Sequence, residues 1–162
     1  MRVLLDTNAY SALMRGHREV AAVVRRTEGV LLSSVVAGEL LYGFRHGSRF
    51  EENAARLEVF LDNPFVTGVP VTFTTAERFG RIAASLRRRG EPIPTNDIWI
   101  AAQAMEIGAD LLSSDSHFGL VDGRHVARRV AEPTSRSSSR YGSHVSERCT
   151  SPSASVTSNR YS

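Results

Sequence analysis

Short apolar runs alternate with helix-patterned segments along the first 130 residues, and this alternation limits the folds open to the chain. Apolar runs bounded by turn or polar residues predict strands at residues 2–5, 30–32, 69–73, 111–113 and 125–127. Strands that alternate with helices pair mainly in parallel, and a parallel sheet needs helices on both faces. The sequence therefore predicts an α/β fold, with a mainly parallel central sheet between two helical layers. Pro70 cannot donate a ladder hydrogen bond, so the third strand should lie at a sheet edge.

The segments between these runs have the apolar spacing and the caps that are typical of helices. Thr7 or Asn8 is expected to cap the first helix, which ends near Arg15, and Ser34 is expected to cap the third, which stops at Gly47. The remaining helices are predicted over residues 19–27, 50–61, 75–89 and 98–107, the last two ending at Gly90 and Gly108.

The composition changes abruptly at Glu132, after which serine and arginine dominate and strong apolar residues nearly vanish. Such a segment buries too little apolar surface to offset the entropy lost on ordering. We therefore predict one domain over residues 1–131, a size sufficient for one core, and a disordered Ser/Arg-rich tail over residues 132–162. An alternative for the tail is a segment that touches RNA.

The content of charged residues and cysteine excludes several classes of protein. All 20 basic residues are arginine, so mechanisms that need a Schiff-base or Walker lysine are excluded. The net charge is only +3, which argues against nonspecific nucleic-acid binding. The single Cys149 excludes an internal disulfide framework, and no apolar run has the roughly 20 residues of a membrane helix. We expect a soluble, cytoplasmic protein with no membrane contact.

Four acidic residues each stand beside an apolar run: Asp6, Glu39, Asp97 and Asp115. Each has an ordinary explanation, because aspartates cap helices and form turns, but Glu39 lies in an apolar helical segment where an unpaired carboxylate is costly. Ligands bind at the carboxyl ends of parallel strands, and all four acids can meet there. Oxygen ligands favour Mg²⁺, with Mn²⁺ possible, over Zn²⁺. Without a cation, the clustered carboxylates should repel one another and raise some pKa values.

Within this predicted metal site, Asp6 and Asp97 are expected to bind the main cation directly. Glu39 and Asp115 are expected to bind directly, through water, or to a second ion. Thr7 and Asn8 are expected either to orient Asp6 or only to cap the helix. His117 is a weaker candidate for a general base, since a histidine beside Phe118 in a loop after a strand is more often structural.

Four segments together resemble the PIN-domain family, specifically the VapC-type toxins of bacterial toxin–antitoxin systems: residues 4–8, 34–43, 96–102 and 112–118. The resemblance implies an α/β/α three-layer domain and a Mg²⁺-dependent endoribonuclease with the four acids as its catalytic metal centre. It also implies an RNA substrate, a homodimer, and a neutralising VapB-type antitoxin that assembles with it into a heterotetramer or larger complex. The tail departs from the family pattern, and so does Ser114, where the family often carries Asn or Thr.

Rival functions are distinguished by single residues. A haloacid-dehalogenase-like phosphatase needs a second aspartate where this chain has Asn8, and a response-regulator receiver needs a lysine. A nuclease-dead PIN module that only binds or autoregulates should lack an acid, yet all four are present. An RNA-processing or DNA-cleaving PIN nuclease that is not a toxin stays an alternative. If the protein is a toxin, we expect the antitoxin to pack on apolar surface near the helices that follow the first two strands.

Overall fold

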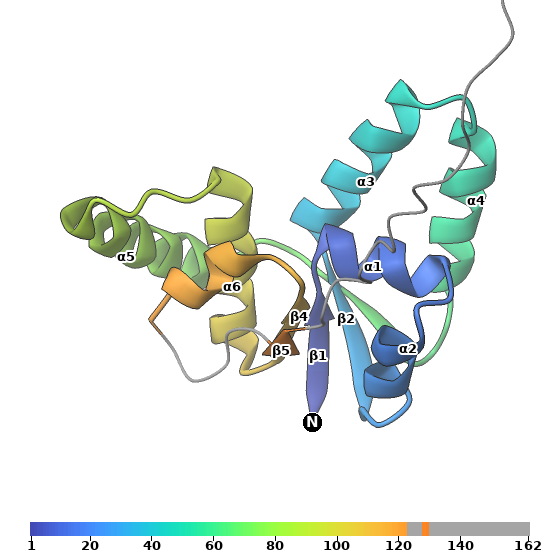
Figure 1. Cartoon of the computed structure of the whole chain (residues 1–162), viewed down its shortest axis with the longest axis horizontal. Helices are drawn as coiled ribbons and strands as arrows, with labels where there is room; N and C mark the ends of the chain where they lie inside the picture. Colours follow the sequence, from blue (N-terminus) through green and yellow to red (C-terminus); the bar gives the residue numbers. More distant parts are fainter. Residues whose placement is uncertain (123–127, 130–162) are drawn as a thin grey trace, which may run out of the picture. The chain divides into compact units, whose positions relative to one another are not determined.

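The computed structural model describes residues 1–122 and 128–129, which form five parallel strands and the helices that cover them (Figure 1). The sheet order is β3-β2-β1-β4-β5, with every neighbouring pair parallel. The strands are β1 (Arg2–Leu5), β2 (Gly29–Ser33), β3 (Val66–Val69), β4 (Asp110–Ser113) and β5 (Arg128–Arg129). The predicted α/β class with a parallel central sheet is confirmed. The predicted tail lies outside the described residues.

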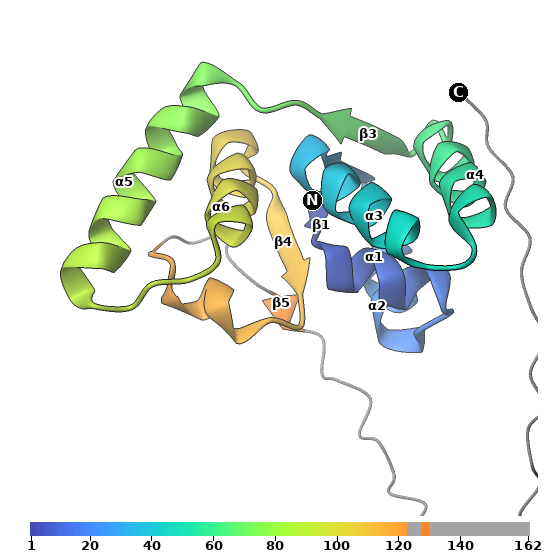
Figure 2. The same ribbon diagram turned by 90° about the horizontal axis from the view of Figure 1, so that it is seen from above.

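Helices cover the sheet on both faces. They are α1 (Thr7–Met14), α2 (Arg18–Val24), α3 (Ser34–His46), α4 (Phe50–Leu61), α5 (Phe73–Arg89) and α6 (Thr95–Ile107), with a short 3₁₀ helix η1 (Ser116–Leu120). Figures 1 and 2 show α1 to α4 on one side of the strands and α5 and α6 on the other. Right-handed crossovers explain this division, because the chain moves outward from β1 to β3 and then returns past β1 to β4. None of the described helices is long and apolar enough to cross a membrane.

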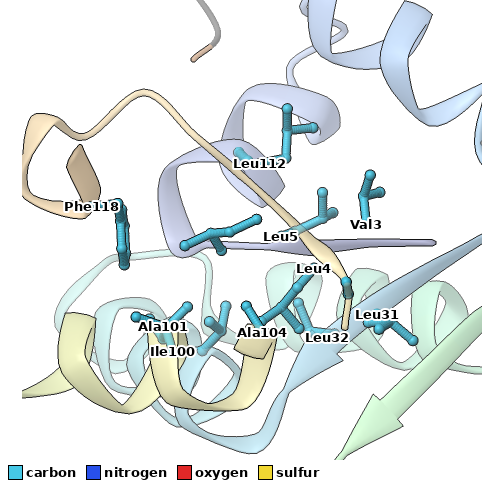
Figure 3. Close-up of a cluster of buried hydrophobic side chains, with 14 of the residues drawn as sticks. Val3, Leu4, Leu5, Leu31, Leu32, Ile100, Ala101, Ala104, Leu112 and Phe118 are labelled. Carbon is cyan, nitrogen blue, oxygen red and sulfur yellow. The ribbon is translucent and has the colours of Figure 1, made fainter. Parts of the chain in front are cut away.

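The core lies on both faces of the central strands, which is why β1, β2 and β4 read as continuous apolar runs. Val3, Leu4 and Leu5 are all fully buried. Leu4 faces α6, where Ile100 and Ala104 pack, whereas Val3 and Leu5 point to the opposite side (Figure 3). This packing fixes the end of β1, and so fixes the position of the residue that follows it.

The third strand differs from its prediction. It spans Val66–Val69 instead of residues 69–73, although it does occupy a sheet edge as expected. Pro70 follows the strand, and Thr72 caps α5 through reciprocal hydrogen bonds with Thr75. This capping box begins the helix at Phe73, so the β-branched and aromatic residues that suggested a strand lie in a connection and a first helical turn.

Two predicted helix caps are wrong by one or two residues. Asp6, not Thr7 or Asn8, caps α1 by accepting a hydrogen bond from the Ala9 amide, and Ser33, not Ser34, caps α3. Asp6 directly follows β1 and Ser33 is the last residue of β2, so each buried strand brings its cap to the helix start. The other helix limits differ from prediction by at most three residues, and Gly90 and Gly108 end α5 and α6 in the left-handed conformation as expected. The strand predicted at 125–127 lies outside the described residues, and β5 begins at Arg128.

Candidate metal centre

All four predicted acids line one cavity of about 410 Å³ at the carboxyl edge of the sheet. Asp6 follows β1 and Asp115 follows β4, while Glu39 lies in α3 and Asp97 in the first turn of α6. Parallel β1 and β4 are neighbours, so the residues after their ends are brought side by side. The topology therefore assembles the cluster from four segments distant in sequence.

Asp6 is the most deeply buried of the acids, with 4% of its surface exposed. Its Oδ1 accepts the Ala9 amide at 2.6 Å, and its Oδ2 accepts the hydroxyl of Ser113. Burial raises the pKa of Asp6 to about 6, against the opposite effect of these two hydrogen bonds, and the charges of Asp115 and Asp97 add to the rise. The side chain is thus held in one orientation, in surroundings that disfavour its charged form.

Glu39 is held by two neutral donors. The hydroxyl of Thr7 donates to Oε2, and the side-chain amide of Asn96 donates to Oε1 at 2.7 Å. The expectation that Thr7 orients Asp6 is therefore wrong, because its hydroxyl serves Glu39 instead. Asn8 lines the same cavity. Glu39 is only partly buried, and these two donors direct it toward the other acids without neutralising its charge.

Asp97 and Asp115 share a third partner, His117. Its Nδ1 lies 3.1 Å from Oδ2 of Asp97 and 3.0 Å from Oδ1 of Asp115. Burial raises the pKa of Asp97, the hydrogen bond from His117 lowers it, and the charges of Asp115 and Glu39 raise it further. Asp115 also caps η1 by accepting the backbone amide of His117 at 2.9 Å.

The charge of this cluster is largely uncompensated by protein. Among the described residues, His117 is the only basic group in an ion pair with any of the four acids, and no arginine pairs with them. The prediction that some pKa values rise is met for Asp6 and Asp97, but burial is the main cause and mutual repulsion is secondary. Several carboxylate oxygens that line one cavity, with few basic side chains to pair with them, are a donor set that fits a hard divalent cation.

Two residues that position these acids were missed in the sequence. Ser113 donates to Asp6 and also accepts the Asp115 amide at 2.8 Å, so it links the ends of β1 and β4. Asn96 directly precedes Asp97 in the sequence, and its side-chain amide donates to Glu39. A serine ending a buried strand and an asparagine before a helical aspartate were the available signals, but neither reveals its partner.

Comparison with known proteins gives a consistent family. The sequence profile of the PIN domain matches residues 3–124. Ribonuclease VapC2 of Haemophilus influenzae is 32% identical over 117 residues, which cover 71% of this chain and 87% of that protein. Ribonuclease VapC5 of Mycobacterium tuberculosis is 26% identical over 120 residues, or 74% of this chain and 87% of the relative.

Solved structures are similar in fold. The VapBC-1 structure from nontypeable Haemophilus influenzae matches with a TM-score of 0.67 and 25% identity, over 74% of this chain and 92% of that one. The structure of VapBC2 from Rickettsia felis, bound to a promoter DNA fragment, matches with a TM-score of 0.65 and 23% identity, over 75% and 93% of the two chains. The second likeness is one of fold alone.

Proposed function

The chain belongs to the PIN domain family, and we propose that it is the toxin of a toxin–antitoxin pair, an endoribonuclease that uses a divalent cation held by Asp6, Glu39, Asp97 and Asp115. The observation that carries this proposal is the convergence of four carboxylates on one cavity where His117 is their only basic ion-pair partner among the described residues. Similarity to proteins named ribonuclease VapC supports the activity.

The proposed chemistry needs no protein nucleophile. A cation bound here, Mg²⁺ or Mn²⁺, would supply positive charge that stabilises the phosphodiester transition state and would lower the pKa of an attacking water. The residues of the chain hold the carboxylates that bind it: the Ala9 amide and Ser113 orient Asp6, and Thr7 and Asn96 orient Glu39. Asp97 and Asp115, which line the same cavity, complete the donor set.

The alternative of a nuclease-dead binding module is not favoured by any feature of the site. Such a module has no need to retain four converging acids, two of which are destabilised by burial. A PIN nuclease that is not a toxin would differ from the proposed toxin in its substrate and its partner, but not in its metal centre. We favour the toxin because the VapC and VapBC proteins are similar over nearly their full length.

An antitoxin partner follows from the same proposal, since the similar VapBC-5 structure from Mycobacterium tuberculosis is described as a member of the VapBC family of toxin–antitoxin systems. An apolar cavity of about 570 Å³ between α1 and α4, lined by Met14, Ala55, Val59 and Phe60 among others, supports the expected docking site. These helices follow β1 and β2, as anticipated. A homodimer that joins two antitoxins in a heterotetramer or larger assembly is part of the proposal. Excess cognate antitoxin should abolish RNA cleavage by the purified protein.

Cleavage of a mixed RNA pool tests the proposed activity. We expect cleavage with Mg²⁺, none with EDTA, and a loss of at least about 100-fold in Asp6→Asn and in Asp97→Asn, because a bound cation contributes several kcal/mol to the transition state. Asp62→Asn is the matched control: it removes an equal charge from the exposed end of α4 and should cleave normally. Cleavage that survives both site substitutions would overturn the proposed centre.

A further inference from the structure

His117 places one ring nitrogen between two of the four acids. Its Nδ1 is 3.1 Å from Oδ2 of Asp97 and 3.0 Å from Oδ1 of Asp115, and these three atoms can face one cation. The imidazole therefore contacts two of the four acids directly. The proposed function assigns it no role.

The spacing of these atoms suits shared coordination. In an octahedral site with bonds of about 2.1 Å, neighbouring donor atoms lie about 3.0 Å apart. The two measured separations from Nδ1 are close to this value.

The local backbone holds the ring in this place. Asp115 caps η1, and its Oδ1 accepts the backbone amide of His117 at 2.9 Å as well as facing Nδ1. Nδ1 is the ring nitrogen nearer the backbone, so anchoring the amide restricts where this nitrogen can go. The side chains of His117, Asp115 and Asp97 are 42%, 26% and 16% exposed, so an ion and its remaining waters can reach the three donors from solvent.

We infer that His117 is a direct ligand of the bound cation, and that its nitrogen gives the centre a preference for first-row transition-metal ions over Mg²⁺. The inference rests on the proposed metal centre and makes it more specific. Magnesium prefers oxygen donors, whereas imidazole favours transition metals, with affinity rising from Mn²⁺ to Co²⁺ along the series. A site made only of carboxylates would show this preference more weakly.

Metal binding measured by calorimetry, without RNA, tests the selectivity. Affinities for Co²⁺, Mn²⁺ and Mg²⁺ are compared in the wild type, in His117→Ala, and in His46→Ala, which removes an exposed histidine at the end of α3. We expect His117→Ala to lower Co²⁺ affinity by at least about tenfold, Mn²⁺ affinity by less, and Mg²⁺ affinity by under about threefold. His46→Ala should leave all three unchanged. Equal losses for the three metals in His117→Ala would overturn the inference.

Pulsed electron paramagnetic resonance of bound Mn²⁺ tests direct ligation without relying on a variant. The wild type should show coupling to a nitrogen nucleus that changes when histidine is labelled with ¹⁵N. The coupling should vanish in His117→Gln, which preserves a polar side chain if His117→Ala fails to fold. Bound Mn²⁺ that supports RNA cleavage but shows no nitrogen coupling overturns this inference and leaves the proposed function standing. Failure of any metal to bind the wild type overturns both.

Discussion

Two buried polar clusters lie at the carboxyl edge of the sheet, and both are built around a serine that ends a strand. In the neutral cluster, Ser33 at the end of β2 donates to Gln103 of α6, and the Gln103 amide donates to the carbonyls of Val69 and Pro70 at 3.2 and 3.0 Å. In the charged cluster, Ser113 at the end of β4 donates to Asp6. Ser33, Gln103 and Ser113 are fully buried, and Asp6 nearly so.

The serine that ends the strand and its direct partner are therefore buried in both clusters, and charge is what separates the clusters. The neutral cluster pairs donors with acceptors and joins β2, β3 and α6, while the Ser33 hydroxyl also accepts the Val35 amide at the start of α3. The charged cluster leaves several carboxylates with His117 as their only basic ion-pair partner in the described part of the chain. A buried polar group thus stabilises the fold when it is neutral and its hydrogen bonds are satisfied. It is a candidate binding site when it is charged and lacks oppositely charged partners.

The largest effect on stability is expected from breaking the neutral cluster. Gln103→Leu leaves the Ser33 hydroxyl and the Val69 and Pro70 carbonyls without this partner in the interior. We expect the free energy of unfolding to fall by about 3 kcal/mol, measured by urea denaturation. In Ser33→Ala/Gln103→Leu both partners are apolar, so the combined loss should be smaller than the sum of the single losses. If the two single losses in the free energy of unfolding simply added, Ser33 and Gln103 would not be energetically coupled, and their description as one cluster would be wrong.

A bound cation should stabilise the charged cluster by nearly as much. At a free concentration 100 times the dissociation constant, Mg²⁺ should raise the free energy of unfolding by about 2.7 kcal/mol, because it binds only the folded site. The shift in melting temperature gives the measurement. Asp97→Asn should show a much smaller shift, while Gln103→Leu should melt lower yet respond to metal normally. An unchanged wild-type melting temperature at millimolar Mg²⁺ would count against the centre.

The pH dependence of stability in EDTA should differ in sign from that of an ordinary surface carboxylate. Burial raises the pKa of Asp6 from 3.8 to about 6, so between these values the folded protein holds a proton that the unfolded chain has lost. Stability must therefore fall as the pH rises from about 4 to about 6, and the loss is complete above that range. The raised pKa of Asp97 acts in the same direction.

Asp6→Asn isolates this contribution. The amide keeps an oxygen for the Ala9 amide but carries no charge, so at pH 7 the metal-free variant should be more stable than the wild type by up to about 3 kcal/mol. The difference should shrink toward zero near pH 4. A variant that is less stable than the wild type at pH 7 would show that Asp6 stabilises the fold and would weaken the contrast between the two clusters.

The smallest effect is expected at Asn96, whose amide donates to Glu39 at the exposed rim of the cavity. Asn96→Ala should reduce RNA cleavage by about tenfold, because groups that orient a metal ligand typically contribute that much, and should change stability by under about 1 kcal/mol. Asn53→Ala, on α4, serves as the matched control and should cleave normally. A large loss of stability with unchanged cleavage would assign Asn96 to the fold instead of the site.

Much of the fold was predictable because its signals are local. Buried strands such as Arg2–Leu5 must be apolar on both faces, and α4 was predicted at its observed limits, Phe50–Leu61, from its apolar spacing. The third strand was misplaced because Val71 and Phe73 have strand propensity, and the capping box at Thr72 overrides it. Strand propensity stabilises a segment less than a pair of specific capping hydrogen bonds does.

The sequence by itself determined the parallel α/β class and the four acids that follow or flank the strands. Both can be recognised locally, because the hydrophobic periods of strands and helices show within a few consecutive residues. Only the tertiary structure decided that Ser113 meets Asp6 across 107 positions, that Thr7 serves Glu39, and that His117 stands between Asp97 and Asp115. Such pairs depend on strand order and on which face each side chain leaves. No local pattern encodes that choice, since it is made by packing the whole core.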